Sequence, residues 1–76
     1  MSNLGVPLDI SGSIERRNGQ LAFVFDRVTN WGGVQVAYAP LDMTQYSSFQ
    51  EGQRVKGTIV PDLDKDDIVI QRLERL

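Results

Sequence analysis

Apolar and polar residues alternate along most of this chain, which is the pattern of β-strands with one buried face. Over residues 8–15 the two faces separate cleanly into Leu8, Ile10, Gly12 and Ile14 on one side and Asp9, Ser11, Ser13 and Glu15 on the other. Asn18–Gly19 follows soon afterwards. This pair favours a tight hairpin, because both central positions of a type I′ turn need φ > 0. We therefore expect a first strand that leads through a hairpin into a second.

Residues 20–26 predict the second strand, and both of its faces are apolar. One face carries Leu21, Phe23 and Phe25, and the other carries Ala22 and Val24. Alternation alone leaves open which face points inward. The aromatic rings either fill the interior or lie outside as a binding surface, and the small Ala22 slightly favours the outward orientation.

The rest of the chain contains three further strand patterns separated by loops. In chain order they are a loop over 27–33, a strand over 34–40, a spacer over 41–53 with room for a short helix or 3₁₀ turn, a strand over 54–60 and an acidic loop over 61–67. A last strand begins at Ile68 and continues through Ile70, and residues 73–76 (LERL) end it or turn helical. In the strand over 54–60 we expect Val55, Gly57 and Ile59 to point inward. Glu51–Gly52 is expected to form a turn.

This order predicts one all-β domain over residues 1–76. Three consecutive strands, a spacer and a final hairpin are what a five-stranded OB-like barrel requires. An SH3-like barrel has a similar number of strands and stays open as an alternative. A closed or nearly closed sheet also protects strand edges in so small a chain.

Composition narrows the function classes. The chain has 76 residues, no Cys, no His and a formal charge of −2. We expect no enzyme activity, because the commonest general base and the thiol nucleophile are both missing and no Gly-rich phosphate loop is present. No apolar run approaches the length of a membrane span, and the first residues do not resemble a signal peptide. We expect a cytoplasmic protein without a membrane partner.

We also expect no cofactor and no metal. Residues 62–67, DLDKDD, begin like a calcium loop, but Asp67 stands where that loop needs Gly and Leu73 stands where it needs Glu. The acidic segment is therefore expected to be a solvated hairpin loop.

Four segments follow one another in a familiar order. Residues 12–14 (GSI) stand in the first strand, residues 20–24 (QLAFV) in the second, residues 34–38 (VQVAY) in the third, and residues 51–55 (EGQRV) at the turn before the fourth. This order resembles the cold-shock domain family, small OB barrels that bind single-stranded RNA and DNA. The family carries Gly-Phe-Gly-Phe-Ile/Val and Val-Phe-Val-His-Phe in its second and third strands and Glu-Gly-Gln-x-Val at the turn. The resemblance spans about residues 10–70, although Leu21, Gln35 and Ala37 replace aromatic or His residues of the family's motifs.

The resemblance implies a stacking surface for bases. Phe23 and Tyr38 keep aromatic positions of the two motifs, and Tyr46 falls where the family often carries an exposed loop aromatic. Trp31, in the expected loop, would extend this surface or fold back to cap the barrel. Arg16, Arg17 and Lys56 would hold phosphates, because guanidinium and ammonium groups pair with them.

Two partner classes therefore follow from the sequence, and a third possibility is a structural subunit whose barrel surface serves only self-association. The leading expectation is a module that binds single-stranded RNA or DNA by stacking and phosphate contacts. The alternative is a protein-interaction or regulatory module on the same barrel surface, which the acidic charge balance favours. The sequence leaves the oligomeric state open.

Overall fold

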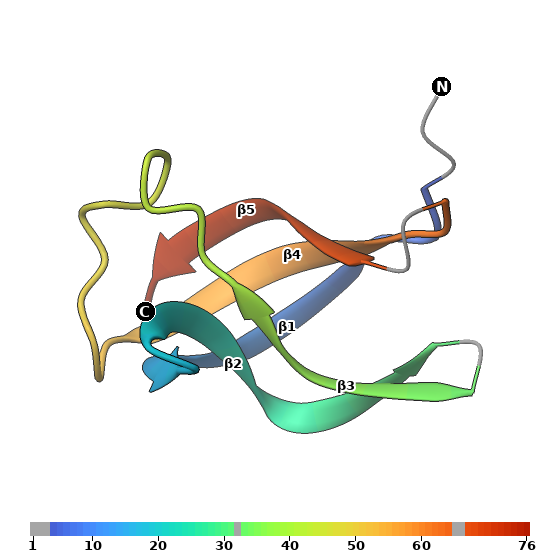
Figure 1. Ribbon diagram of the computed structural model, residues 1–76, viewed down its shortest axis with the longest axis horizontal. Helices are drawn as coiled ribbons and strands as arrows, with labels where there is room; N and C mark the ends of the chain where they lie inside the picture. Colours follow the sequence, from blue (N-terminus) through green and yellow to red (C-terminus); the bar gives the residue numbers. More distant parts are fainter. Residues whose placement is uncertain (1–3, 32, 65–66) are drawn as a thin grey trace.

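The computed structural model describes residues 4–31, 33–64 and 67–76, with the backbone alone for Trp31 and Val34, and contains five strands (Figure 1). These are β1 (Leu8–Arg17), β2 (Gln20–Trp31), β3 (Val34–Pro40), β4 (Arg54–Asp62) and β5 (Asp67–Arg75). Every neighbouring pair is antiparallel, and the order in the sheet is β3-β2-β1-β4-β5. The prediction of an all-β fold with five strands is confirmed.

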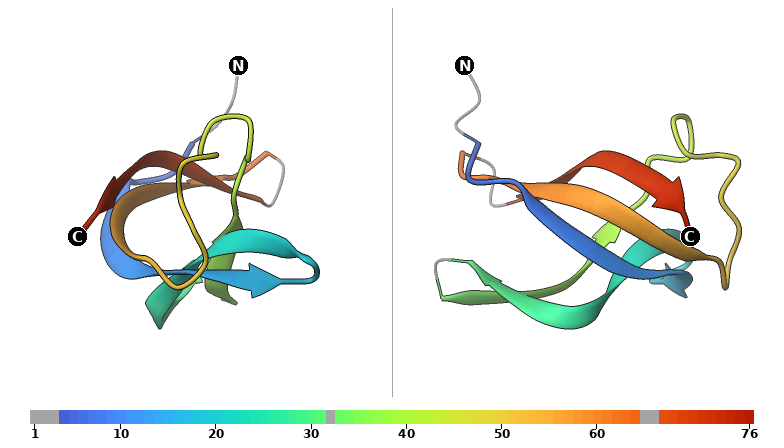
Figure 2. Two further views of the ribbon diagram at one scale, coloured as in Figure 1. Left: turned by 90° about the vertical axis from the view of Figure 1, so that its left-hand side faces the viewer. Right: turned by 180° about the vertical axis from the view of Figure 1, so that it is seen from behind.

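The strand order is a Greek key. The first three strands form a meander, and the fourth returns through residues 41–53 to lie beside the first. A five-stranded, partly open Greek-key barrel is the OB architecture, so this order favours it over the SH3-like alternative. The sheet curls so that β3 and β5 face each other (Figure 2). Within the described residues no strand pairing joins them, so the barrel is not closed.

Phe23 occupies the centre of the barrel. Its side chain is fully buried, and its ring packs edge-on against Phe25 with 5.1 Å between ring centroids. A Cβ atom added at Gly12 or Gly57 would lie 2.8 or 2.9 Å from carbon atoms of the Phe23 ring. The ring therefore fills the space that glycine leaves on β1 and on β4. The outward orientation of the aromatic face is wrong, because both rings are buried in the interior. The ring of Phe23 lies where two neighbouring strands, β1 and β4, carry glycine.

The inward faces of β1 and β4 agree with the alternation in the sequence. Ile14, Val55 and Ile59 are fully buried, and they form one cluster with the two phenylalanines. The same cluster contains Ala39 at the end of β3 and Leu41 directly after it. The buried core thus connects β1, β2, β3 and β4.

Three element boundaries differ from the sequence prediction. The strand β2 continues through Arg27 to Trp31, where a loop was expected, and its pairing with β3 shifts register between Val24 and Thr29. The loop prediction rested on Asn30 and on the paired glycines after it, yet Asn30 lies within the strand. The acidic loop is shorter than expected because β4 runs to Asp62, and β5 continues as a strand to Arg75 rather than turning helical.

The spacer over 41–53 forms turns, and no helix occurs in this segment, all of which is described. Its first turn is held by Asp42, whose carbonyl oxygen accepts hydrogen bonds from the backbone N–H groups of Gln45 and Tyr46 (3.0 and 2.8 Å). The expected turn at Glu51–Gly52 is present, and the Gly52 N–H donates to the carbonyl oxygen of Ile14 (2.6 Å). The spacer arches over the same end of the barrel as the C-terminus (Figures 1 and 2).

The β1–β2 hairpin turn has the backbone that its sequence predicts. Asn18 and Gly19 have φ of 53° and 83°, and Asn18 is the single non-glycine residue with positive φ among the described residues. A Cβ atom at Gly19 would meet nothing within 4 Å. Any loss of stability caused by a side chain at Gly19 therefore comes from its positive φ and not from a steric clash.

Replacement of Gly19 by alanine should lower the free energy of unfolding by about 1 kcal/mol, because a left-handed backbone is strained for an L-residue with a side chain. Urea denaturation followed by circular dichroism measures this loss. The matched variant Asn18→Gly should lose less, since glycine adopts positive φ without strain. An equal loss in both variants would show that the turn geometry is not the cause.

Candidate nucleic-acid interface

The strand registers place one row of side chains across the outer face of the sheet. Ser13 pairs with Arg54 of β4 and with Val24 of β2, and Val24 pairs with Tyr38 of β3. Because cross-strand partners share a face, and Ile14 and Phe23 beside them point inward, this row points outward. Four strands thus contribute to one continuous surface.

Tyr38 is the aromatic residue of this outer row. It is half-buried, and its hydroxyl oxygen accepts a hydrogen bond from the side-chain amide of Asn18 (3.3 Å). The β1–β2 turn therefore fixes the end of the Tyr38 side chain, while part of the residue stays accessible. OB barrels in general bind oligonucleotides on the face of strands 2 and 3, and Tyr38 lies on the outer face of β3.

Arg16 and Arg17 lie beside the β1–β2 turn, as expected, and each is paired with an acid. Arg16 Nε lies 3.4 Å from a carboxylate oxygen of Glu51, and Arg17 Nη2 lies 3.4 Å from Glu15. All four side chains are at least 41% exposed. Exposed ion pairs are weak, typically about 0–1 kcal/mol, so a phosphate can replace either acid.

A stronger ion pair lies further along the outer face. The Arg54 guanidinium donates two hydrogen bonds to the carboxylate of Asp26, each 2.7 Å long, and the Ser11 hydroxyl donates to the same carboxylate. These hydrogen bonds, first from Arg54 and then from Ser11, lower the pKa of Asp26 to about 2. Asp26 is ionised at neutral pH and binds the Arg54 guanidinium through both of its carboxylate oxygens.

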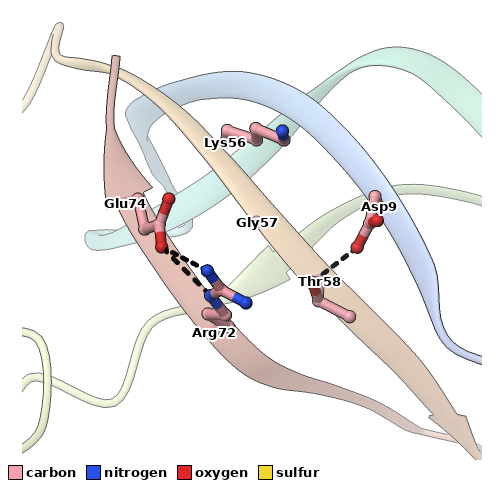
Figure 3. Close-up of a pocket in the computed structure, with 6 residues that line it drawn as sticks. All are labelled: Asp9, Lys56, Gly57, Thr58, Arg72 and Glu74. Carbon is pink, nitrogen blue, oxygen red and sulfur yellow. Dashed lines mark hydrogen bonds and ion pairs between the residues drawn. The ribbon is translucent and has the colours of Figure 1, made fainter.

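Lys56 stands exposed on the outer face of β4, between two depressions. Figure 3 shows the one that it shares with Asp9, Thr58, Arg72 and Glu74. Arg72 there pairs with Glu74 (2.7 Å), and the Thr58 hydroxyl donates to Asp9 (2.6 Å). Lys56 makes no hydrogen bond or ion pair to any residue that the structure describes. Its charge is therefore available to a ligand.

Two predicted stacking residues are not on this surface. Phe23 is buried in the core, so its assignment as a base-stacking residue is wrong. Tyr46 belongs to the spacer and is half-buried; its hydroxyl donates to the carbonyl oxygen of Ile70 (3.2 Å), and its ring packs at 64° to that of Phe49. Burial, together with the nearby charge of Asp42, raises the pKa of the Tyr46 phenol. Tyr46 is thus part of the cover over one barrel end rather than an exposed loop aromatic.

Arg75 of β5 also contacts this cover over the barrel end. The Arg75 guanidinium lies 5.2 Å from the centre of the Phe49 ring and donates to the carbonyl oxygen of Ser48 (2.9 Å). Together with the Tyr46–Ile70 hydrogen bond, these contacts hold the spacer against the outer edge of β5. Trp31 ends β2 and pairs with Val34 through its backbone, but its side chain lies outside the described residues.

Among the described residues, no three acidic side chains converge on a position that would hold a metal ion. The described residues also contain no helix with the length and apolarity to cross a membrane.

Comparisons with protein-family models, with curated proteins and with solved structures found no match to this chain. The resemblance to cold-shock domains therefore depends on the residues quoted above and on the strand order, and it enters below as a proposal.

Proposed function

We propose that this chain is a non-enzymatic module that binds single-stranded RNA or DNA across the outer face of β1, β2 and β3, in the manner of cold-shock domains. The observation that carries the proposal is the outward position of Tyr38 in the Arg54–Ser13–Val24–Tyr38 row of a barrel with OB strand order. A base stacked on an aromatic ring of this kind contributes about 1–3 kcal/mol.

The charges around Tyr38 indicate weak binding that is sensitive to salt. Arg16 and Arg17 flank the β1–β2 turn, to which Tyr38 is hydrogen-bonded through Asn18. Both cations must exchange an acid for a phosphate, and the chain as a whole carries a formal charge of −2. Release of counterions from phosphates then supplies a modest part of the affinity, and added salt removes it.

Replacement of Tyr38 by alanine should raise Kd for a short oligothymidylate or oligouridylate about tenfold, because one stacking surface is lost. Fluorescence anisotropy of the labelled oligonucleotide measures the change. Tyr38→Phe keeps the ring and loses only the hydrogen bond to Asn18, so its Kd should stay close to that of the parent. An alanine variant that binds as tightly as the parent would contradict the proposal.

A protein partner is the second candidate, and a specific feature favours it. The apolar side chains of Leu4, Leu63 and Val69 are all at least 39% exposed near the β4–β5 hairpin, where the backbone of Leu4 bridges to Asp62. In addition, the edge strand β3 carries no charged residue. A protein interface built on such residues would depend little on salt, whereas phosphate contacts weaken steeply as salt rises.

A further inference from the structure

Among the described residues, two exposed cations differ from the others in having no acid partner. Arg16, Arg17, Arg54 and Arg72 each pair with a carboxylate, and Arg75 stacks on Phe49. Arg27 and Lys56, in contrast, make no ion pair with any residue in the described ranges. Both are exposed, and both line one depression of about 270 Å³ across β1, β2 and β4.

Arg27 reaches this depression from the part of β2 where the register against β3 shifts. Asp26 and Arg27, which are consecutive, both line the depression. Three consecutive residues of β1 line it as well, so the depression is bordered by side chains from both faces of the strands: Asp9, Ile10 and Ser11. Arg27 thus adds a cation to the lining of the depression.

The four charged residues that line the depression, Asp9, Asp26, Arg27 and Lys56, carry no net charge by themselves. Arg54, which does not line the depression, neutralises Asp26 through two hydrogen bonds, and Asp9 accepts a hydrogen bond from the uncharged Thr58. When Arg54 is counted with them, three cations and two carboxylates leave one positive charge. One phosphodiester group carries the single negative charge that balances it.

We propose that this depression is a phosphate site in which Arg27 and Lys56 hold one phosphodiester group. This proposal rests on the proposed function, because the phosphodiester group would belong to the single-stranded nucleic acid that the module binds. Ser11 and Lys56 are paired and lie next to the row that contains Tyr38, two residues further along β1 and β4. Tyr38 and the depression are therefore separated by a distance on the order of 10 Å. Since OB-type sites span several nucleotides, one strand reaches both.

The test compares the Arg27→Gln/Lys56→Gln double variant with the parent and with Arg72→Gln. Arg72 is the matched control, because it is an exposed arginine of the same sheet face whose charge is already paired with Glu74. Affinity for a short oligothymidylate is measured between about 50 and 200 mM salt. In the double variant the slope of log K against log salt should be shallower by about 0.7, the value for one phosphate contact to a single strand. The control should keep the slope of the parent, and an unchanged slope in the double variant would overturn the site.

A second measurement separates this inference from the proposed function. Inorganic phosphate is titrated into the isotopically labelled parent and double variant, and backbone amide shifts are followed by NMR. Shifts at Ser11, Arg27 and Lys56 in the parent alone would support the site even if no oligonucleotide binds, and would assign free phosphate as its ligand. If oligonucleotides bind through Tyr38 but these amides and the salt slope do not respond, the depression is not a phosphate site and the proposed function stands without it.

Discussion

Phe23→Ala should lower the free energy of unfolding by about 3–5 kcal/mol, the usual loss when a buried phenylalanine is truncated. The Phe23 side chain is fully buried and packs edge-on against Phe25. Its ring occupies the space that a side chain at Gly12 or Gly57 would need. Alanine would leave a cavity that neither glycine can fill. A domain of this size has a total stability of roughly 4–11 kcal/mol, so the variant should be close to unfolding at room temperature. Urea denaturation followed by circular dichroism measures the loss.

Two further variants keep this prediction testable if Phe23→Ala does not fold. Phe23→Leu should fold and lose about 1.5 kcal/mol, because it keeps most of the apolar volume. Tyr38→Ala, on the outer face, should change stability by much less than Phe23→Ala. If Phe23 were instead a surface residue that stacks on bases, its alanine variant would lose oligonucleotide affinity while its stability changed by about 0.5 kcal/mol or less.

Gly57→Ala should cost about 3 kcal/mol through overpacking. The added Cβ would lie 2.9 Å from the carbonyl oxygen of Arg72, 2.9 Å from Cε2 of Phe23 and 3.0 Å from Cδ1 of Leu73. The first of these atoms belongs to the backbone of β5, so the strand itself must move. Gly12→Ala should cost still more, because its Cβ would collide with the carbonyl oxygen of Val24. Chemical denaturation of the two variants gives the comparison.

A double-mutant cycle tests whether glycine is needed to accommodate the Phe23 ring. Gly57→Ala should be less costly in a Phe23→Leu background, since the smaller side chain withdraws one of the close contacts. A coupling of at least about 0.5 kcal/mol in this direction is expected. Additive effects would mean that the ring and Gly57 are independent, and the account of the core would be wrong.

The inward orientation of Phe23 in β2 could have been predicted from the sequence, although not from the alternation of β2 alone. Both faces of residues 20–26 are apolar, so a two-residue period cannot choose between them. Gly12 and Gly57, however, already fell on the inward faces predicted for the first and fourth strands. Two glycines facing one interior leave a volume that only a large side chain fills. This pairing of small with large residues indicates an inward Phe23, and it becomes visible only when the strands are considered together.

The outer face was harder to predict because its contacts are distant in sequence. Arg54 and Asp26 lie 28 residues apart, and no local spacing marks them as partners. The irregular pairing of β2 with β3 around Arg27 is likewise set by distant contacts. Asn30 and the glycines that follow it are instead typical of a loop. Tyr46 was misplaced because nothing in its sequence shows that residues 41–53 fold back onto β5. Tyr38 and Lys56 do lie on the outer face, since each follows the simple alternation of its strand.

The central claim is that single-stranded nucleic acid binds across the outer face of β1, β2 and β3. An NMR titration of the labelled protein with a short oligothymidylate, at about 50 mM salt where phosphate contacts are strong, tests it most directly. The account predicts that backbone amides of Ser13, Val24 and Tyr38 shift together and saturate, while those of Leu63 and Val69 at the β4–β5 hairpin do not move. An unchanged spectrum, or shifts confined to that hairpin, would contradict the claim and direct the search toward a protein partner.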